Sequence, residues 1–511
     1  MHRTMHILEG LGHHHEQSSI YPHPYDHPYF GQYFLAGMLA IVGYPDSLNL
    51  SSSTTDGDTI HSIEMLYLIP RVLMGVLAVI DTFLLYKIAE RRYNRTIALI
   101  ASILFAVMPI TWLLRKILLE SLLLPLLLSS ILFALYTKDQ KRNYNIKNKK
   151  NILIVLLSGI FLGLAILTKI PIFTMIPLVG YVVYTYSNKN WKVLGIWFIP
   201  VVLIPLIWPV DSILLGDFDL WIKDVIWHTE RQSNNSDSPV GTTLFNSLKY
   251  LFQIEPVLVI LGVAGIFFAE IKRDFMLLLW VIPFLIFLFT IDFVSFFHFI
   301  SLLPAFCIAA ASMIVDLSNR ISYKKIQQIL PFVVILSIGA FGLINTTTLI
   351  TTNVTSTYFQ IYASIVRYLA NEEKVNDRDD NNNNDNSMTM IGRHWTRGLF
   401  WIPRYVYDID LDFKKVDNAN DIPISIETKK GIFIVDNRIK RFMFDEKKDM
   451  QNGQQNLNLY YNTIPIATFK DKSLRYDFDK YPYASMSQNR EERWVEIRAY
   501  ANTSNILWDI Y

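Results

Sequence analysis

Long apolar segments recur along the first 350 residues of the chain and alternate with shorter polar ones. A helix that crosses a hydrocarbon core of about 30 Å needs about 20 apolar residues, or about 17 when interfacial side chains flank it. Ten segments meet this requirement, and they predict a polytopic helical membrane bundle. The predicted spans are residues 66–86, 97–114, 117–136, 152–169, 171–186, 193–209, 250–269, 275–291, 298–316 and 328–350.

Lysine and arginine are distributed unevenly among the connections between these spans. One set of connections holds 17 basic residues in 44 positions, whereas the opposite set holds only 7 in a far longer stretch. Because basic loops stay in the cytoplasm, the amino terminus, residues 210–249 and everything after about residue 350 are predicted to lie on the outer face. The basic connections are residues 87–95, 138–150, 187–192, 270–274 and 317–327.

The last third of the chain has the composition of a soluble domain. It contains an expected helix at 357–372 and expected strands at 388–392 (M-T-M-I-G) and 431–436 (G-I-F-I-V-D). We therefore expect an all-α polytopic membrane bundle that carries a small α/β extracytoplasmic domain. The expected division is an external loop with an interfacial helix at 1–65, a transmembrane bundle at 66–350 and the α/β domain at 351–511.

The composition agrees with a multi-pass protein of the cell membrane and excludes several other classes. The chain is 51% hydrophobic and only 18% charged, and its Phe, Tyr and Trp residues, 14% of the total, suit two membrane interfaces. Its 47 basic and 45 acidic residues balance too evenly for a nucleic-acid-binding protein. The single cysteine, Cys307, excludes a disulfide framework.

A polar segment with the sequence Y-D-H-P-Y-F-G-Q, residues 25–32, precedes the first predicted span. It places the carboxylate of Asp26 beside the imidazole of His27. Pro28 fixes the entry to a helix, and Gly31 permits close packing. The segment could hold reactive groups at the outer rim of the bundle, or it could simply be a capped interfacial helix.

Charged residues also lie at the outer ends of two span pairs. Arg115 and Glu120 of R-K-I-L-L-E would be costly there unless they are paired or functional. A structural alternative is an i, i+4 ion pair between Lys116 and Glu120. Lys169 closes the segment G-L-A-I-L-T-K-I-P, where a lysine commonly reaches toward the lipid headgroups.

Further polar residues are candidates for proton transfer or metal binding. His228 and Arg231 lie in the predicted external loop, and His298 lies in a later outer turn. Each histidine is also compatible with an ordinary interfacial position. Within the first span, Asp81 is expected to be interfacial, and it would line a pathway with Arg71 if the protein were a transporter.

Four motifs occur in order along residues 1–350: Y-D-H-P-Y-F-G-Q, R-K-I-L-L-E, G-L-A-I-L-T-K-I-P and F-F-H-F-I-S-L-L-P-A. In this arrangement the chain resembles the polytopic GT-C glycosyltransferases. The most similar type is the dolichyl-phosphate-mannose protein mannosyltransferase family, together with its relative, the aminoarabinose transferase that acts on lipid A. The resemblance implies transfer of a hexose, mannose in the first of these types, from a polyprenyl-phosphate donor to a protein or lipid acceptor.

The resemblance also implies roles for individual residues. Arg115 and Lys169 match family positions whose cations would bind the donor phosphate. Asp26, His27 and Glu120 match positions in the catalytic motifs, with Glu120 in place of an aspartate. Asp26 also matches a metal-binding position of the aminoarabinose branch, and His228 is its candidate partner for a divalent metal ion.

Two other classes of function remain open from the residues alone. A transporter or flippase of lipid-linked sugars would use intramembrane charges to line a pathway. A non-catalytic membrane assembly protein would use its outer domain to bind a partner. The long polar outer segments and the large outer domain favour the glycosyltransferase.

Residues 1–9 have the pattern of the last turns of a helix, with Gly10 and Gly12 as terminators. The family's main catalytic carboxylate lies on a loop that would precede this point. We therefore expect a longer reading frame with an eleventh span upstream of Met1, or a truncated product of low activity. A complete protein of 511 residues would have to use Glu9, Glu16 or Asp26 as the base.

Overall fold

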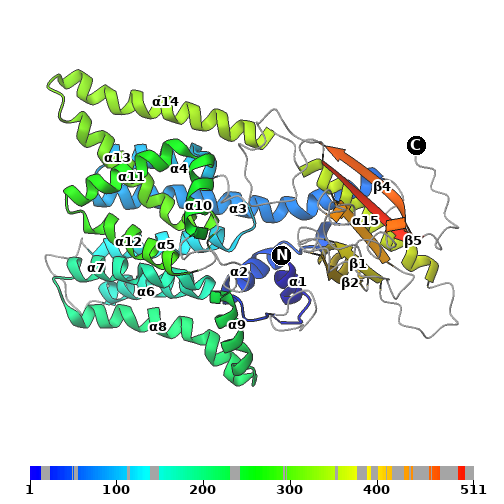
Figure 1. The fold of residues 1–511 in the computed structure, drawn as a ribbon. Helices are drawn as coiled ribbons and strands as arrows, with labels where there is room; N and C mark the ends of the chain where they lie inside the picture. Colours follow the sequence, from blue (N-terminus) through cyan, green and yellow to red (C-terminus); the bar gives the residue numbers. More distant parts are fainter. Residues whose placement is uncertain are drawn as a thin grey trace.

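The computed structural model shows an elongated molecule, with a helical bundle at one end and a mixed β-sheet at the other (Figure 1). Helices α1 (His2–Leu8) and α2 (Phe30–Ile41) lie between the two parts, and the long helix α3 (Asp56–Arg92) runs from one part into the other. The structure describes residues 1–12, 23–48, 50, 56–111, 116–137, 149–230, 242–291, 294, 296–351, 355–376, 388–392, 401–409, 411–416, 431–436, 439–440, 460–461, 463–471 and 493–500.

Helices account for every predicted span. Among the described residues, six helical segments are long and apolar enough to cross a membrane, and shorter apolar helices cover the other predicted spans. The chain is therefore a multi-pass membrane protein. The six are α3, α5 (Leu119–Tyr136), α6 (Lys149–Thr168), α8 (Trp191–Leu214), α13 (Leu303–Ser318) with the turn η6 (Phe296–Leu302) before it, and α14 (Lys324–Thr351). The shorter ones are α4 (Arg95–Val107), α7 (Ile176–Tyr186) with η4 (Ile170–Met175), α11 (Pro256–Ile271) and α12 (Phe275–Thr290).

The segment predicted as a span at 250–269 is not one helix. It is divided between α10 (Thr242–Ile254) and α11, with Glu255 at the junction. Pro256 is the first residue of α11, a position that proline favours because its missing N–H would have no partner inside the helix. Helix α9 (Phe218–Glu230) follows α8 and lies in the loop predicted at residues 210–249, where α10 also begins.

Helices α6 and α8 pack so closely that their backbones touch. A Cβ atom built on Gly159 would lie 2.4 Å from the carbonyl oxygen of Trp197, and one on Gly163 would lie 2.7 Å from that of Pro200. Small residues four apart let membrane helices approach in this way. Gly159 and Gly163 therefore form the surface of α6 that packs against α8.

The predicted strands are confirmed with the same bounds, as β1 (Met388–Gly392) and β3 (Gly431–Asp436), and helix α15 (Thr355–Asn376) contains the expected helix. The sheet has the order β2-β1-β3-β5-β4. Strands β2 (Leu411–Lys415) and β3 run parallel to β1, whereas β5 (Arg493–Tyr500) runs antiparallel to both β3 and β4 (Thr463–Asp471).

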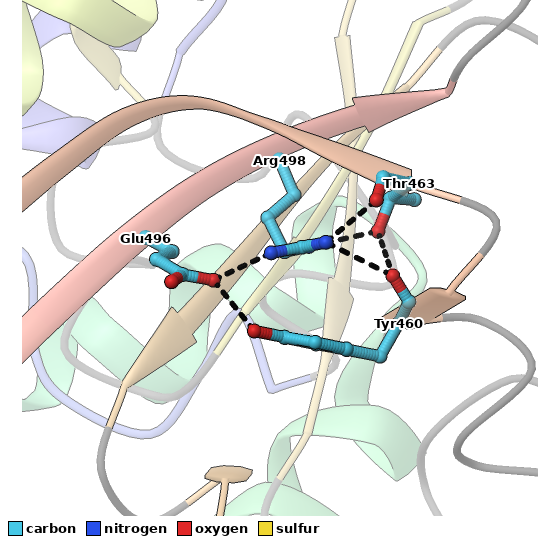
Figure 2. Close-up of polar contacts among 4 residues, drawn as sticks. All are labelled: Tyr460, Thr463, Glu496 and Arg498. Atoms are coloured by element: carbon cyan, nitrogen blue, oxygen red, sulfur yellow. Dashed lines mark hydrogen bonds and ion pairs between the residues drawn. The ribbon is translucent and has the colours of Figure 1, made fainter.

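A polar cluster ties β5 to β4 on one face of the sheet. The guanidinium of Arg498 donates to Glu496, to the hydroxyl and carbonyl oxygens of Thr463 and to the carbonyl of Tyr460 (Figure 2). The same group lies 3.8 Å from the centre of the Tyr460 ring. Four hydrogen bonds and a cation–π contact satisfy a buried charge that would otherwise be costly.

The sheet and the bundle share a hydrophobic core. The amino-terminal part of α3 packs along α15, and Arg71 lies over the rings of Tyr67 and Phe359 at 5.5 and 6.0 Å. Helix α1 contacts α17 (Trp401–Val406), where His6 and Tyr405 share a hydrogen bond. A helix of 37 residues is roughly 55 Å long, far longer than a bilayer core is thick, so α3 can join both parts.

The contact between α6 and α8 provides a test of the bundle. In Gly159→Ala, the new methyl group would overlap the Trp197 carbonyl, so the free energy of unfolding should fall by on the order of 1–3 kcal/mol. Gly195 on α8 is the matched control, because a Cβ there meets nothing within 4 Å. Gly195→Ala should leave thermal unfolding in detergent unchanged or raise its midpoint, since alanine favours a helix by up to about 1 kcal/mol. Equal midpoints for the two variants would contradict the close packing.

Candidate functional site

Several helix ends that carry the sequence motifs meet at one end of the bundle, which we call the motif end. They are the beginning of α2, the beginning of α5, the end of α6 and the turn η6. Residues that are far apart in the chain, from Gly31 to His298, are therefore close to one another there. The motif end is the end of the bundle nearer to α1 and the sheet (Figure 1).

A buried ion pair lies at the centre of the motif end. The ammonium group of Lys169 donates a hydrogen bond to the carboxylate of Glu120, and both residues are more than nine-tenths buried. The structural alternative, an i, i+4 ion pair between Lys116 and Glu120 on one helix, is not what the structure shows. Lys116 precedes α5, which begins at Leu119, so the two residues do not share one helix. Lys169 is likewise paired inside the protein and does not extend to the surface.

The local backbone explains why these two side chains can meet. Helix α6 ends at Thr168, and Lys169 is extended, with φ −156° and ψ 119°. Pro171 follows two residues later and cannot continue an α-helix. Glu120 lies in the first turn of α5, where the exposed N–H groups of the helix favour a negative charge.

Gly31 brings the first turn of α2 against this pair. A Cβ atom on Gly31 would lie 2.8 Å from a methyl of Leu119 and 3.0 Å from the methyl of Thr168. These residues directly precede Glu120 and Lys169, respectively. The expected close packing of Gly31 is confirmed, and it places the Y-D-H-P-Y-F-G-Q segment beside the ion pair.

The turn η6 adds aromatic and imidazole groups to the motif end. The ring centre of Phe297 lies 4.9 Å from the ammonium nitrogen of Lys169, a distance at which a cation is attracted to the ring face. His298 is the next residue and is buried. The structure thus places His298 next to a residue that contacts Lys169.

Asp26 forms an ion pair with Arg3 of α1, at 2.7 Å. Among the described residues, no group of three or more His, Cys, Asp or Glu side chains could hold a metal ion. His27 lies between Asp26 and α2 and is partly buried. Arg115 and Arg231 lie outside the described residues, and for His228 the structure describes only its place in α9, so the pairing of Asp26 with His228 stays a hypothesis.

Sequence reasoning missed the residues that hold the Y-D-H-P-Y-F-G-Q segment in place. Asp224 of α9 is completely buried, and its carboxylate accepts hydrogen bonds from His23 Nδ1 at 2.8 Å and from the backbone N–H of Tyr25 at 2.9 Å. The hydroxyl of Tyr25 lies 3.3 Å from the carboxylate of Asp217, to which it donates. Burial and this carboxylate raise the pKa of Tyr25, so its hydroxyl keeps its proton.

The remaining carboxylates considered as bases are placed differently. Glu9 follows α1, and burial together with the charges of Asp46 and Asp408 raises its pKa. Glu16 lies outside the described residues. The expected helix at residues 1–9 is confirmed as α1, and Gly10 and Gly12 both have φ +76°, as helix-terminating glycines do.

Comparison with solved structures identifies the fold. The chain is similar to the oligosaccharyltransferase of Archaeoglobus fulgidus tethered to an acceptor peptide with the sequon NVT, with 14% identity and a TM-score of 0.51 over 91% of this chain and 67% of that chain. It is also similar to ArnT from Cupriavidus metallidurans bound to undecaprenyl phosphate, with 11% identity and a TM-score of 0.50 over 97% of this chain and 92% of that chain. The chain therefore has the fold of the GT-C glycosyltransferases.

The family comparison agrees with this fold. Residues 23–215 match the sequence model of the dolichyl-phosphate-mannose-protein mannosyltransferase family, which confirms the resemblance carried by the motifs. The matched region contains Asp26, Glu120 and Lys169. No curated protein sequence matches the chain. A third similar structure is the archaeal oligosaccharyltransferase AglB from Archaeoglobus fulgidus, in complex with an inhibitory peptide and a dolichol-phosphate, at 13% identity and a TM-score of 0.46. The match covers 80% of this chain but only 59% of AglB, so this chain spans little more than half the length of that protein.

The ion pair provides a test that does not require a known activity. Lys169→Met leaves the carboxylate of Glu120 buried without a cation, which should lower the free energy of unfolding by about 3–5 kcal/mol. Adding Glu120→Gln removes the uncompensated charge, so the double variant should recover most of the lost stability. Thermal unfolding in detergent measures both. A double variant no more stable than Lys169→Met would mean that the two side chains do not depend on each other.

Proposed function

We propose that the protein transfers a hexose, mannose in the first instance, from a polyprenyl-phosphate donor to a protein or lipid acceptor. The observation that carries the proposal is the buried Glu120–Lys169 pair at the motif end, within the residues that match the mannosyltransferase family model. The polyprenyl phosphate in the ArnT structure supports a lipid-linked donor. The reaction would occur at the outer membrane face, on the side where the distribution of basic loops predicts the motif end.

Lys169 is suited to bind the phosphate that leaves with the lipid. An ammonium group has three N–H donors, and Glu120 accepts from only one of them. As the bond from the sugar to the phosphate breaks, negative charge develops on the phosphate oxygens. A buried cation stabilises this charge strongly because the surroundings have a low dielectric constant. Glu120 would hold the ammonium group in position, and Arg115 would supply a second cation.

Asp26 and His27 are proposed to line the acceptor side of the same site. They directly precede Pro28 and α2, and the packing of Gly31 fixes the start of α2 against Leu119 and Thr168. His298 of η6 would line the site from the opposite side, next to Phe297. His228 and Arg231 of the α9 region are further candidates for contact with the acceptor or the donor headgroup.

The experiment follows label from a radiolabelled donor. Purified protein in lipid is incubated with radiolabelled polyprenyl-phosphate mannose and a membrane fraction that supplies acceptors. Transfer of label to protein or to a new lipid is expected. The Lys169→Met, Glu120→Gln double variant should remain folded but turn over on the order of 10² to 10³ more slowly, because it lacks the cation at the leaving group. Arg115→Ala should show a loss of the same order.

The alternatives predict different outcomes. Label that crosses the bilayer while remaining on the donor would indicate a transporter or flippase. If the label neither leaves the donor nor crosses the bilayer, whichever polyprenyl-phosphate hexose is used, the result would indicate an assembly protein. Normal turnover in the double variant would exclude Lys169 from donor binding even if the wild-type protein is active.

A further inference from the structure

The aromatic ring of Phe297 lies against the cation of the buried ion pair. Its centre is 4.9 Å from the ammonium nitrogen of Lys169, within the distance of about 6 Å at which a ring face attracts a cation. The ring is partly buried and packs against the hydrophobic core of the bundle. Lys169 is only 6% exposed, so little water competes with this attraction.

The turn η6, which carries Phe297, is anchored by hydrogen bonds on both sides of the ring. Before Phe297, the carbonyl oxygen of Val294 accepts a hydrogen bond from the hydroxyl of Ser247 in α10. After it, the carbonyl oxygen of Ser301 accepts the indole N–H of Trp280 in α12, at 3.0 Å. The ring is therefore carried by a segment that is tied to two helices of the bundle.

Deeply buried side chains hold the same turn in place. Three of them have no exposed surface: Phe299, Ile300 and Leu302. A shift of the turn would pull these side chains out of a closely packed interior and open voids there. Phe297 thus reaches Lys169 from a rigid base.

The ring and the carboxylate of Glu120 act on the same ammonium group. Glu120 accepts one of the three N–H donors, and among the described residues Lys169 forms no second ion pair. The ring attracts the ammonium group through its face and neutralises none of its charge. The two contacts together fix the position of the group and leave N–H donors for an anion.

An aromatic ring suits a phosphate-binding lysine better than a second carboxylate would. A second carboxylate would hold the ammonium group more strongly, but its negative charge would repel the phosphate that leaves with the lipid. The face of a phenyl ring is weakly negative and carries no net charge. It can therefore hold the cation in place while the charge of the cation stays available to the phosphate.

We propose that Phe297 is a positioning residue that holds the ammonium group of Lys169 where negative charge develops on the donor phosphate. This inference rests on the proposed glycosyl transfer. More charge lies on the phosphate oxygens while the bond to the sugar breaks than in the bound donor. A fixed cation therefore stabilises the transition state more than it stabilises donor binding, so loss of the ring's attraction should lower kcat and leave KM for the donor unchanged.

Fluorinated phenylalanines test the attraction with little change in the shape of the side chain. Fluorine withdraws electrons from the ring face, so 4-fluoro-, 3,5-difluoro- and 3,4,5-trifluorophenylalanine in place of Phe297 attract a cation progressively less. We expect kcat for transfer from polyprenyl-phosphate mannose to fall stepwise, by about 2- to 30-fold for the trifluorinated ring. Phe297→Tyr keeps the ring face and should retain most of the turnover.

Phe299 provides the matched control. It is completely buried in the same turn, and among the described residues its ring lies over no cation. The same fluorinated residues in place of Phe299 should leave kcat unchanged. An equal loss at both positions would mean that fluorine disturbs the packing of the turn, and it would overturn the positioning role.

Thermal unfolding in detergent tests the contact without any activity. Trifluorination of Phe297 should lower the unfolding midpoint while Lys169 is present, because it weakens a buried cation–π contact. It should have no effect in the Lys169→Met, Glu120→Gln double variant, which has no cation at the ring. Equal shifts in the two backgrounds would show that the ring and the ammonium group do not attract each other.

The outcomes separate this role from the proposed function. If the wild-type protein transfers sugar and fluorination of Phe297 leaves kcat unchanged, the role of Phe297 alone is overturned. A rise in KM with an unchanged kcat would overturn it as well. Wild-type protein that transfers no sugar from any polyprenyl-phosphate hexose would overturn the proposed function, and the positioning role with it.

Discussion

Buried charges are costly in the low polarity of a membrane bundle, and the motif end is built around one pair of opposite charges that are in contact. Moving a carboxylate or an ammonium group out of water costs several kcal/mol, so Glu120 and Lys169 are tolerable only in contact with each other. Their contact requires α6 to end at Thr168, α5 to begin at Leu119 and the two helix ends to lie side by side. The fold thus holds a buried, paired ammonium group at the motif end.

Close helix packing also fixes the positions of the helix ends that carry the motif residues. Gly159 and Gly163 bring α6 against the backbone of α8, and Ser130 and Ser158 exchange hydrogen bonds between α5 and α6. Helix α8 leads into α9, whose Asp224 binds the segment that enters α2. The contacts in the bundle therefore determine the position of a polar segment from the beginning of the chain.

Two helices, α1 and α3, join the bundle to the sheet. Helix α3 packs against α15 near the sheet and continues into the bundle, while α1 contacts both α2 and α17. Arg3 of α1 in turn pairs with Asp26 of the motif segment. Helices α1 and α3 therefore connect the sheet to residues of the motif end.

The sequence alone determined the elements whose signals are local. Apolar length identified the helices of the bundle, and short apolar segments within the polar last third identified β1 and β3. Strands β2, β4 and β5 were missed, because β2 is short and polar and because all three are recognisable chiefly by their pairing. Gly31, Glu120 and Lys169 were singled out from the sequence, but nothing in the sequence indicated that Lys169 is the partner of Glu120.

Tertiary structure decided which charges meet. Glu120 and Lys169 are 49 positions apart, and His23 and Asp224 are 201 apart, so no periodicity or spacing connects them. Such pairs depend on which helix ends the packing brings together, and packing is a property of the whole bundle. Composition and pattern determined that the protein is a polytopic bundle with a small α/β part, whereas only the folded chain determined the pairing of its buried charges.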